Sequence, residues 1–365
     1  MPIRLFILLS LAISGVRVHA GDQPRLSAAT PPLAHCGELY ASPFASRSDA
    51  WSRECDDHVV RSYRHHHDGL GFEILDFESE ACFVPDDEYK LLDQLIDQVE
   101  AKVHYDPGVL DTAGRIQQAS LISKTISDTM AKNGFGLYIP TDTLSDALLN
   151  RASVGQPARY IFDCDTGSFI FLTISDSIKA PVSLVDINLP SGAGHNYVQW
   201  KIDDLHSMNW DMNGRAECLT PPDLPAYQGK PMSRTQTLGY ARALRAAIWS
   251  ARQVYDRALA DFRSAMQMYP ESPLSYNNFA WMIATKDMPN RTALAADALD
   301  ASLKATSIES TANYLDTLAC VYALKKDFSQ AIKVENEALA KSPGTKDYEA
   351  RLALLEKSVD CTGAK

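Results

Sequence analysis

The sequence contains little that would suit a membrane or a nucleic acid. After residue 20, no stretch approaches the roughly 20 apolar residues that a helix needs to cross a bilayer. Lys and Arg number 35 against 46 Asp and Glu, and they form no long basic block. The broad positive surface that attracts nucleic acids is therefore missing. We expect no membrane span after residue 20 and no nucleic-acid partner.

Paired metal-ligand motifs are also lacking, since the sequence has no Cys-x-x-Cys and no His-x-x-x-His. Such spacings are typical of zinc sites. His65, His66 and His67 are consecutive, but adjacent side chains in a looping chain point in different directions. Three successive histidines need special backbone geometry to converge on one ion. We therefore expect a solvated loop here, no metal site and no cofactor.

The first 20 residues resemble an export signal. Positive charge lies in residues 1–4, an apolar run follows in residues 5–13, and Val18-His19-Ala20 offers small residues at the cleavage positions. We predict a signal peptide over residues 1–20 that is cleaved near Ala20, with the mature chain periplasmic or secreted. An uncleaved anchor is the alternative.

Cysteines are few and odd in number: the chain has seven. An exported protein meets an oxidising compartment in which disulfides persist. At least one thiol must stay unpaired within the chain, and the spacing does not choose among the connectivities. Cys320 lies among apolar residues of a helical pattern, so we expect a buried free thiol there.

At 365 residues the chain is long enough for about two domains. Residues 21–85 are rich in loop-forming residues and predict an irregular N-terminal segment. Apolar residues at spacings of three and four then predict helices over 88–103 and 116–130. A short helix is expected over 144–150, capped by Thr141 or Thr143.

The next part predicts a helix followed by three strands. A helix should begin at Cys164, because short polar residues precede the apolar run that starts at Phe169. Strands are expected over 182–189, 195–202 and 205–210, with a tight turn at Asp203-Asp204 between the last two. The proline-rich residues 221–238 predict a linker.

From residue 239 to 360 the pattern is helical and repeats. Ala246, Ala280 and Ala319 occupy equivalent places, separated by 34 and then 39 residues. A period of 34 is that of the tetratricopeptide repeat. The five extra residues predict a longer loop near 286–291, and residues 346–359 predict a capping helix.

Cys164, His195 and Asp211 form a candidate catalytic triad. A helix N-terminus and a neighbouring imidazolium lower the pKa of a thiol. In a hairpin that turns at 203–204, the start of the first strand lies beside the end of the second, so Asp211 can orient the His195 ring. Asn209 is the reserve orienting residue and His206 the reserve base.

These residues resemble the transglutaminase-like, papain-like cysteine superfamily. The resemblance rests on Asp163-Cys164-Asp165, on His195 to Trp200 and on Asn209-Trp210-Asp211, within residues 86–220. Phe162-Asp163 departs from the Gly that many relatives carry before the nucleophile. Bacterial members joined to tetratricopeptide repeats exist in that superfamily. The resemblance implies an α+β domain, with helices and a small antiparallel sheet, before an all-α repeat array.

The expected function follows from this arrangement. We predict an exported thiol-dependent amide hydrolase or transamidase that acts on protein or peptide, with the repeats recruiting substrate or partner. The oxyanion would be held by the Cys164 backbone N–H and a donor from upstream, Gln156 or Tyr160. The alternative is a catalytically inactive scaffold that binds a partner through its repeats.

Overall fold

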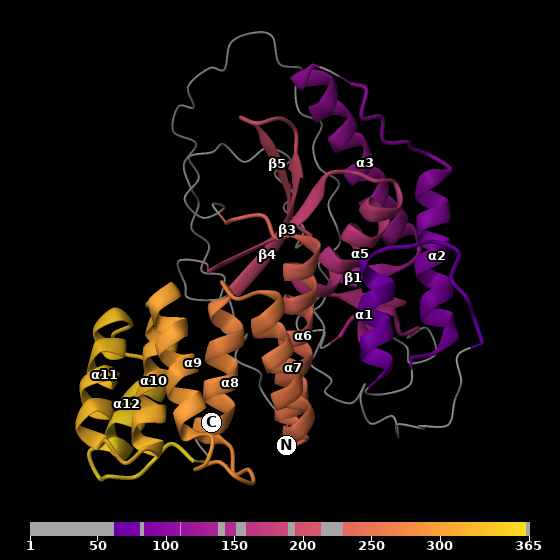
Figure 1. Cartoon of the computed structure of the whole chain (residues 1–365). Coiled ribbons are helices and arrows are strands. Elements are labelled where there is room, and N and C mark those ends of the chain that lie inside the picture. Colours follow the sequence, from indigo (N-terminus) through magenta and orange to yellow (C-terminus); the bar gives the residue numbers. More distant parts are fainter. Residues whose placement is uncertain are drawn as a thin grey trace. The chain divides into compact units, whose positions relative to one another are not determined.

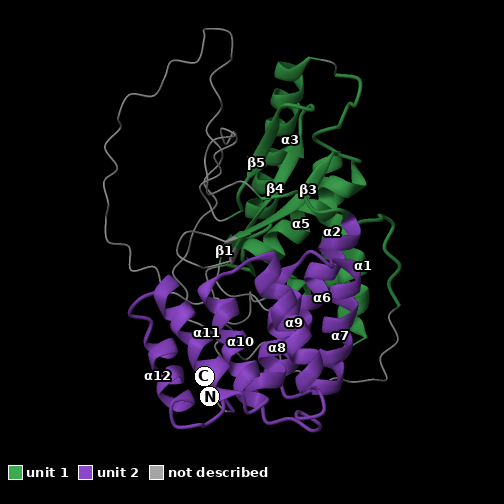
Figure 2. Ribbon diagram, turned by 60° about the vertical axis from the view of Figure 1, so that its left-hand side comes forward, with its two compact units in different colours: residues 1–233 green, residues 234–365 purple. Residues whose placement is uncertain are grey.

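The computed structural model describes residues 62–80, 84–109, 111–137, 143–150, 158–188, 194–212 and 229–362. The predicted signal peptide lies outside these residues. The chain divides into two compact units, residues 1–233 and 234–365 (Figure 2). Helix α6 begins at Arg234, so the last five residues of the predicted linker, 234–238, are helical. Among the described residues no helix is long and apolar enough to cross a membrane.

The described residues of unit 1 form helices and two small sheets, a mixed α and β structure. Its described helices contact one another and strands of both sheets, and they bury most of their apolar side chains (Figure 1). The elements are α1 Leu70–Ser79, α2 Asp86–Glu100, α3 Thr112–Lys132, β1 Phe135–Leu137, α4 Leu144–Leu148, β2 Tyr160–Phe162, α5 Cys164–Ser177, β3 Val182–Asn188, β4 Gly194–Lys201 and β5 Ser207–Trp210.

The larger described sheet has the order β3-β4-β5 and is antiparallel throughout. One of its faces is covered by helices: the indole N–H of Trp200 donates to Ser123 Oγ on α3 at 2.8 Å, and that of Trp210 donates to Ser127 Oγ at 3.1 Å. Both indoles are almost fully buried, where an unpaired N–H would be costly. These bonds fix the sheet against α3.

Helix α1 corrects the expectation of an irregular segment over 21–85. Its exposed residues Glu73, Asp76 and Ser79 recur at a spacing of three between buried apolar residues, so the helix has a short polar face. With only ten residues, this signal is obscured by the loop-rich composition of residues 21–85. Gly71 permits a close approach to α5, because a Cβ there would lie 2.4 Å from Thr173 Oγ1. The Gly71 N–H instead donates to that oxygen at 2.7 Å.

The parallel pair β1 and β2 was not expected from the sequence. Phe135 pairs with Tyr160 and Leu137 with Phe162. Each strand is only three residues long, too short for alternation to be recognised. The pair matters for function because β2 leads directly into the N-terminus of α5.

Within its described residues, 234–362, unit 2 is built from helices that contact in sequential pairs: α6 with α7, α8 with α9 and α10 with α11, followed by α12. Ala246, Ala280 and Ala319, which occupy equivalent places in the repeat, have no exposed surface. The longer loop is also confirmed, since it spans 286–294 between α8 and α9. The bounds are α6 Arg234–Ala251, α7 Tyr255–Met268, α8 Pro273–Thr285, α9 Ala295–Ile308, α10 Ala312–Leu324, α11 Phe328–Lys341 and α12 Lys346–Leu355.

The expectation of a free thiol at Cys320 is wrong. Cys320 is buried, but it forms a disulfide with Cys361, with a Cα–Cα distance of 5.5 Å. After α12 the chain turns back so that Cys361 reaches α10, a return that periodicity does not predict. Cys36, Cys55, Cys82 and Cys218 lie outside the described residues.

Candidate active site

Helix α5 begins at the predicted nucleophile, and Asp163 caps it. The Asp163 carboxylate accepts hydrogen bonds from the Thr166 backbone N–H at 3.0 Å and from its hydroxyl at 2.9 Å, while the Thr166 hydroxyl accepts from the Asp163 N–H. This reciprocal capping box satisfies backbone donors of the first turn. It fixes Cys164 as the first residue of the helix.

The Cys164 thiol is free and partly buried. Its sulfur accepts a hydrogen bond from the backbone N–H of Asn196, so it lies against the peptide group that joins His195 to Asn196. Burial raises the pKa of Cys164 well above its ordinary value, and the negative charges of Asp165 and Asp163 raise it further. The thiol is therefore held in its protonated form at neutral pH.

His195 and Asp211 meet as the sequence predicted. His195 Nε2 lies 2.8 Å from Asp211 Oδ2, and both side chains are buried. Val198 pairs with Trp210 across β4 and β5, so continuing this register places Asp211 opposite Tyr197. Tyr197 and His195 share a face of β4, so Asp211 reaches His195 on the diagonal.

Asn196 is a site residue that the sequence analysis did not identify. Its side chain is fully buried; its amide nitrogen donates to Asp165 Oδ1 and its amide oxygen accepts from Ser168 Oγ at 2.9 Å. One residue thus joins β4 to the first turn of α5. Alternation along the strand could have indicated it, because the neighbour of His195 must face the opposite side.

The predicted oxyanion donors and the reserve residues for the triad are the remaining sequence-based candidates. Tyr160 stacks its ring on Phe135 with centroids 4.8 Å apart, and Gln156 lies outside the described residues. Asn209 Oδ1 accepts from Gln199 Nε2 at 2.9 Å. His206 Nδ1 lies 2.8 Å from Asp203 Oδ1 in the exposed turn. The partner of His195 that the structure places beside the ring is thus Asp211 and not the reserve residue.

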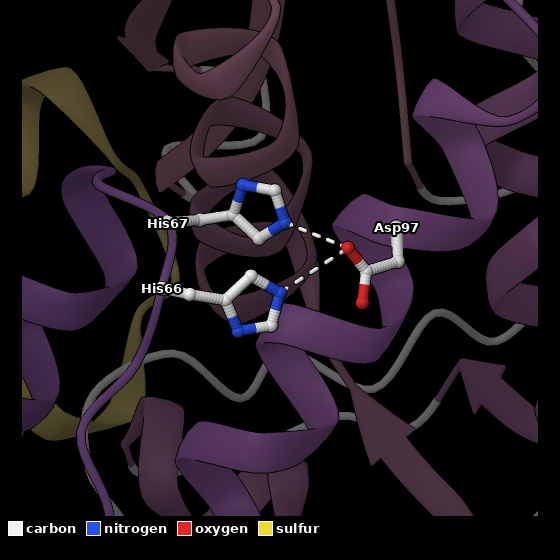
Figure 3. A group of neighbouring side chains, drawn as sticks. All are labelled: His66, His67 and Asp97. Atoms are coloured by element: carbon white, nitrogen blue, oxygen red, sulfur yellow. Dashed lines mark hydrogen bonds and ion pairs between the residues drawn. The ribbon is translucent and has the colours of Figure 1, made fainter.

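In a second cluster, two of the three successive histidines converge on one carboxylate, although all three do not, as the sequence predicted. His66 Nε2 and His67 Nε2 lie 3.2 Å and 2.9 Å from the same oxygen, Asp97 Oδ1 (Figure 3). His65 alone turns away, stacking on Phe72 with centroids 4.2 Å apart. The three side chains His66, His67 and Asp97 could therefore hold a metal ion.

Comparison with known proteins gives no relative from which a role for these residues could be inferred, because no protein-family model and no curated protein matches the chain.

Proposed function

We propose that the chain is a thiol-dependent acyl transferase, an amide hydrolase or transamidase of the transglutaminase-like kind. Two contacts carry the proposal. His195 Nε2 lies 2.8 Å from Asp211 Oδ2, and the peptide group that joins His195 to Asn196 contacts the Cys164 sulfur. A nucleophile, a base and a residue that orients the base are the parts that acyl transfer needs.

Each residue has a distinct role in the proposed reaction. Asp211 holds Nε2 of His195, so Nδ1 is the nitrogen that takes the thiol proton. As the proton leaves, Cys164 Sγ bonds to the carbonyl carbon of the substrate amide. His195 then returns the proton to the nitrogen of the leaving amine, the C–N bond breaks, and a thioester remains on Cys164.

The raised pKa of Cys164 selects between two forms of this mechanism. A preformed thiolate would need an environment that lowers the thiol pKa, whereas burial and the neighbouring carboxylates raise it here. The proton therefore moves to His195 together with the attack, as general-base catalysis requires. Water completes hydrolysis of the thioester, and an amine completes transamidation.

The repeated helix pairs of unit 2 support the second half of the proposal. We assign them to a tetratricopeptide-like array that recruits a protein or peptide substrate or partner. Small buried alanines at Ala246, Ala280 and Ala319 suit the close crossing of paired helices. Export by the N-terminal signal would place this activity in the periplasm or outside the cell.

An activated ester tests the chemistry without knowledge of the natural substrate. We expect the full chain to release p-nitrophenol from p-nitrophenyl acetate in a burst and to gain one acetyl group at Cys164, detected by intact-mass and peptide mass spectrometry. Cys164→Ala and His195→Ala should both abolish the burst, because members of such a unit fail together. Unchanged melting temperatures would show that both variants fold.

The absence of acyl transfer would favour the alternative, a catalytically inactive protein that binds a partner. If the full chain shows no burst and no acetyl adduct, the thiol domain is catalytically idle. Binding through the repeat unit would then be the remaining function.

A further inference from the structure

The segment before α1 runs alongside α2 and is held there by three carboxylates of that helix. Asp86 accepts from the Ser62 hydroxyl at 2.6 Å and from the Tyr63 N–H at 3.0 Å. Asp93 and Asp97 follow at helical spacings that keep them on the same face. The chain of residues 62–67 is therefore laid along α2 in a defined register.

Asp93 supplies the special backbone geometry that two adjacent histidines need in order to converge. It is 1 % exposed and accepts from the backbone N–H groups of His66 at 3.1 Å and His67 at 3.2 Å. The Tyr63 hydroxyl donates to the same carboxylate at 2.6 Å, and this bond raises the pKa of Tyr63 to about 12. Both imidazoles are consequently directed at Asp97, one turn further along α2.

The distances at Asp97 approach those of a metal site. One ligand atom from each of His66, His67 and Asp97 lies within 4.8 Å of the other two. Ligands in a tetrahedral zinc site, with bonds of about 2.0 to 2.1 Å, are about 3.3 Å apart. The two Nε2–Oδ1 separations, 3.2 Å and 2.9 Å, are within a few tenths of this value.

The contacts made by the second ring nitrogen, Nδ1, of each histidine also suit a metal site. His66 Nδ1 lies 3.1 Å from Asp93 Oδ2, and His67 Nδ1 lies 4.0 Å from Glu100 Oε1. Metal-binding histidines usually donate their second ring N–H to a carboxylate, which fixes the ring and selects the nitrogen that binds. Asp93 lies within ion-pair distance of Nδ1 of His66, on the opposite side of the ring from Nε2, which is the atom directed at Asp97.

We propose that His66, His67 and Asp97 form a zinc site with three protein ligands and one position for water (Figure 3). Water can reach this position because the side chains of His66 and Asp97 are 56 % and 54 % exposed. The ion would fasten residues 62–67 to α2. It would thereby fix the start of α1, whose N–H groups bond to Thr173 and Asp176 on α5.

The test is a titration of the metal-stripped, tag-free full chain with ZnCl2, followed by competition with a chromophoric chelator. We expect one equivalent of zinc to bind and to raise the melting temperature. His66→Ala and His67→Ala should each weaken binding by about 100-fold or more, since loss of an outer-shell partner alone costs 10- to 100-fold. His104→Ala is the matched control, because His104 is exposed just after the same helix, and should bind zinc as the parent does.

Two further variants make the result decisive. Asp97→Asn keeps the side-chain volume but removes the ligand charge, so it should weaken zinc binding even if a histidine variant folds poorly. Cys164→Ser should leave the affinity unchanged, and Co²⁺ should bind without thiolate-to-cobalt absorption. No saturable binding, binding that survives all three ligand substitutions, or binding lost in Cys164→Ser would each overturn the proposal.

Discussion

His195 and Asp211 meet on the diagonal of the β4–β5 ladder, with 2.8 Å between Nε2 and Oδ2. A diagonal pair requires β4 and β5 to be in this register, because a slip of one residue would turn Asp211 to the opposite face. The register is supported from the other side of the sheet, where Trp200 and Trp210 bond to serines of α3. The candidate site therefore depends on packing that lies outside it.

Asp211→Asn should reduce acyl transfer on the order of 10⁴-fold in kcat, since an amide favours the wrong tautomer of the histidine. The natural control is Asn209→Ala: Asn209 bonds to Gln199, so its loss should leave the rate nearly unchanged. Burst kinetics with p-nitrophenyl acetate measure both. A larger rate loss in Asn209→Ala than in Asp211→Asn would assign the orienting role to the amide.

Asp163→Asn should shift thiol reactivity to lower pH. The charge of Asp163 raises the pKa of Cys164, so its removal lowers that pKa and increases the thiolate fraction at any given pH. Asparagine caps a helix about as well as aspartate, so the start of α5 should persist. The measurement is the pH profile of iodoacetamide labelling at Cys164.

Asp111→Asn provides the matched control for that shift. Asp111 caps α3 by accepting from the Gly114 N–H at 2.7 Å, so the substitution is chemically the same at a different helix. Its labelling profile should overlay that of the parent. Equal shifts in the two variants would point to a general charge effect and contradict a local one.

Ala280→Leu should destabilise unit 2 by about 1 to 3 kcal/mol, because added methylenes in a closely packed interior force neighbouring side chains apart. Ala280 has no exposed surface. Ala260→Leu on α7 adds the same atoms at an exposed position and should change stability by less than about 0.5 kcal/mol. Urea unfolding measures both, and equal effects would argue against tight helix crossings at Ala280.

The sequence predicted those parts of the molecule that depend on patterns of neighbouring residues. The helix start at Cys164 and the buried alanines each follow from patterns within a few residues or one repeat. The tight turn predicted at Asp203-Asp204 is wrong: Lys201 pairs with Ser207, so the five residues 202–206 join β4 to β5. The bonds of Asn196 to Asp165 and Ser168 could not be predicted, because they join segments about 30 residues apart. The same holds for Asp93, whose buried carboxylate aligns His66 and His67 from a different element.

Unit 2 contains a buried charged cluster that periodicity did not predict either. Arg351 on α12 donates to Asp316 on α10 and lies over the rings of Trp281 and Tyr348, 5.3 Å from each centroid. Glu335 on α11 is fully buried nearby. Burial raises the pKa of Glu335, and the charge of Asp316 raises it further, while Arg351 opposes both effects.

Glu335→Gln should therefore stabilise unit 2 increasingly as the pH rises. The folded state favours protonated Glu335, whereas the unfolded state releases this proton near the ordinary value of 4.5. Above that value the unfolded chain binds fewer protons, so the parent loses up to about 1.4 kcal/mol per pH unit until the folded carboxyl also ionises. Glutamine does not titrate, and the variant should escape this loss.

Urea unfolding at several pH values measures the difference. Glu337→Gln is the matched control, because Glu337 is exposed on the same helix. If both variants follow the pH profile of the parent, Glu335 is not the group responsible.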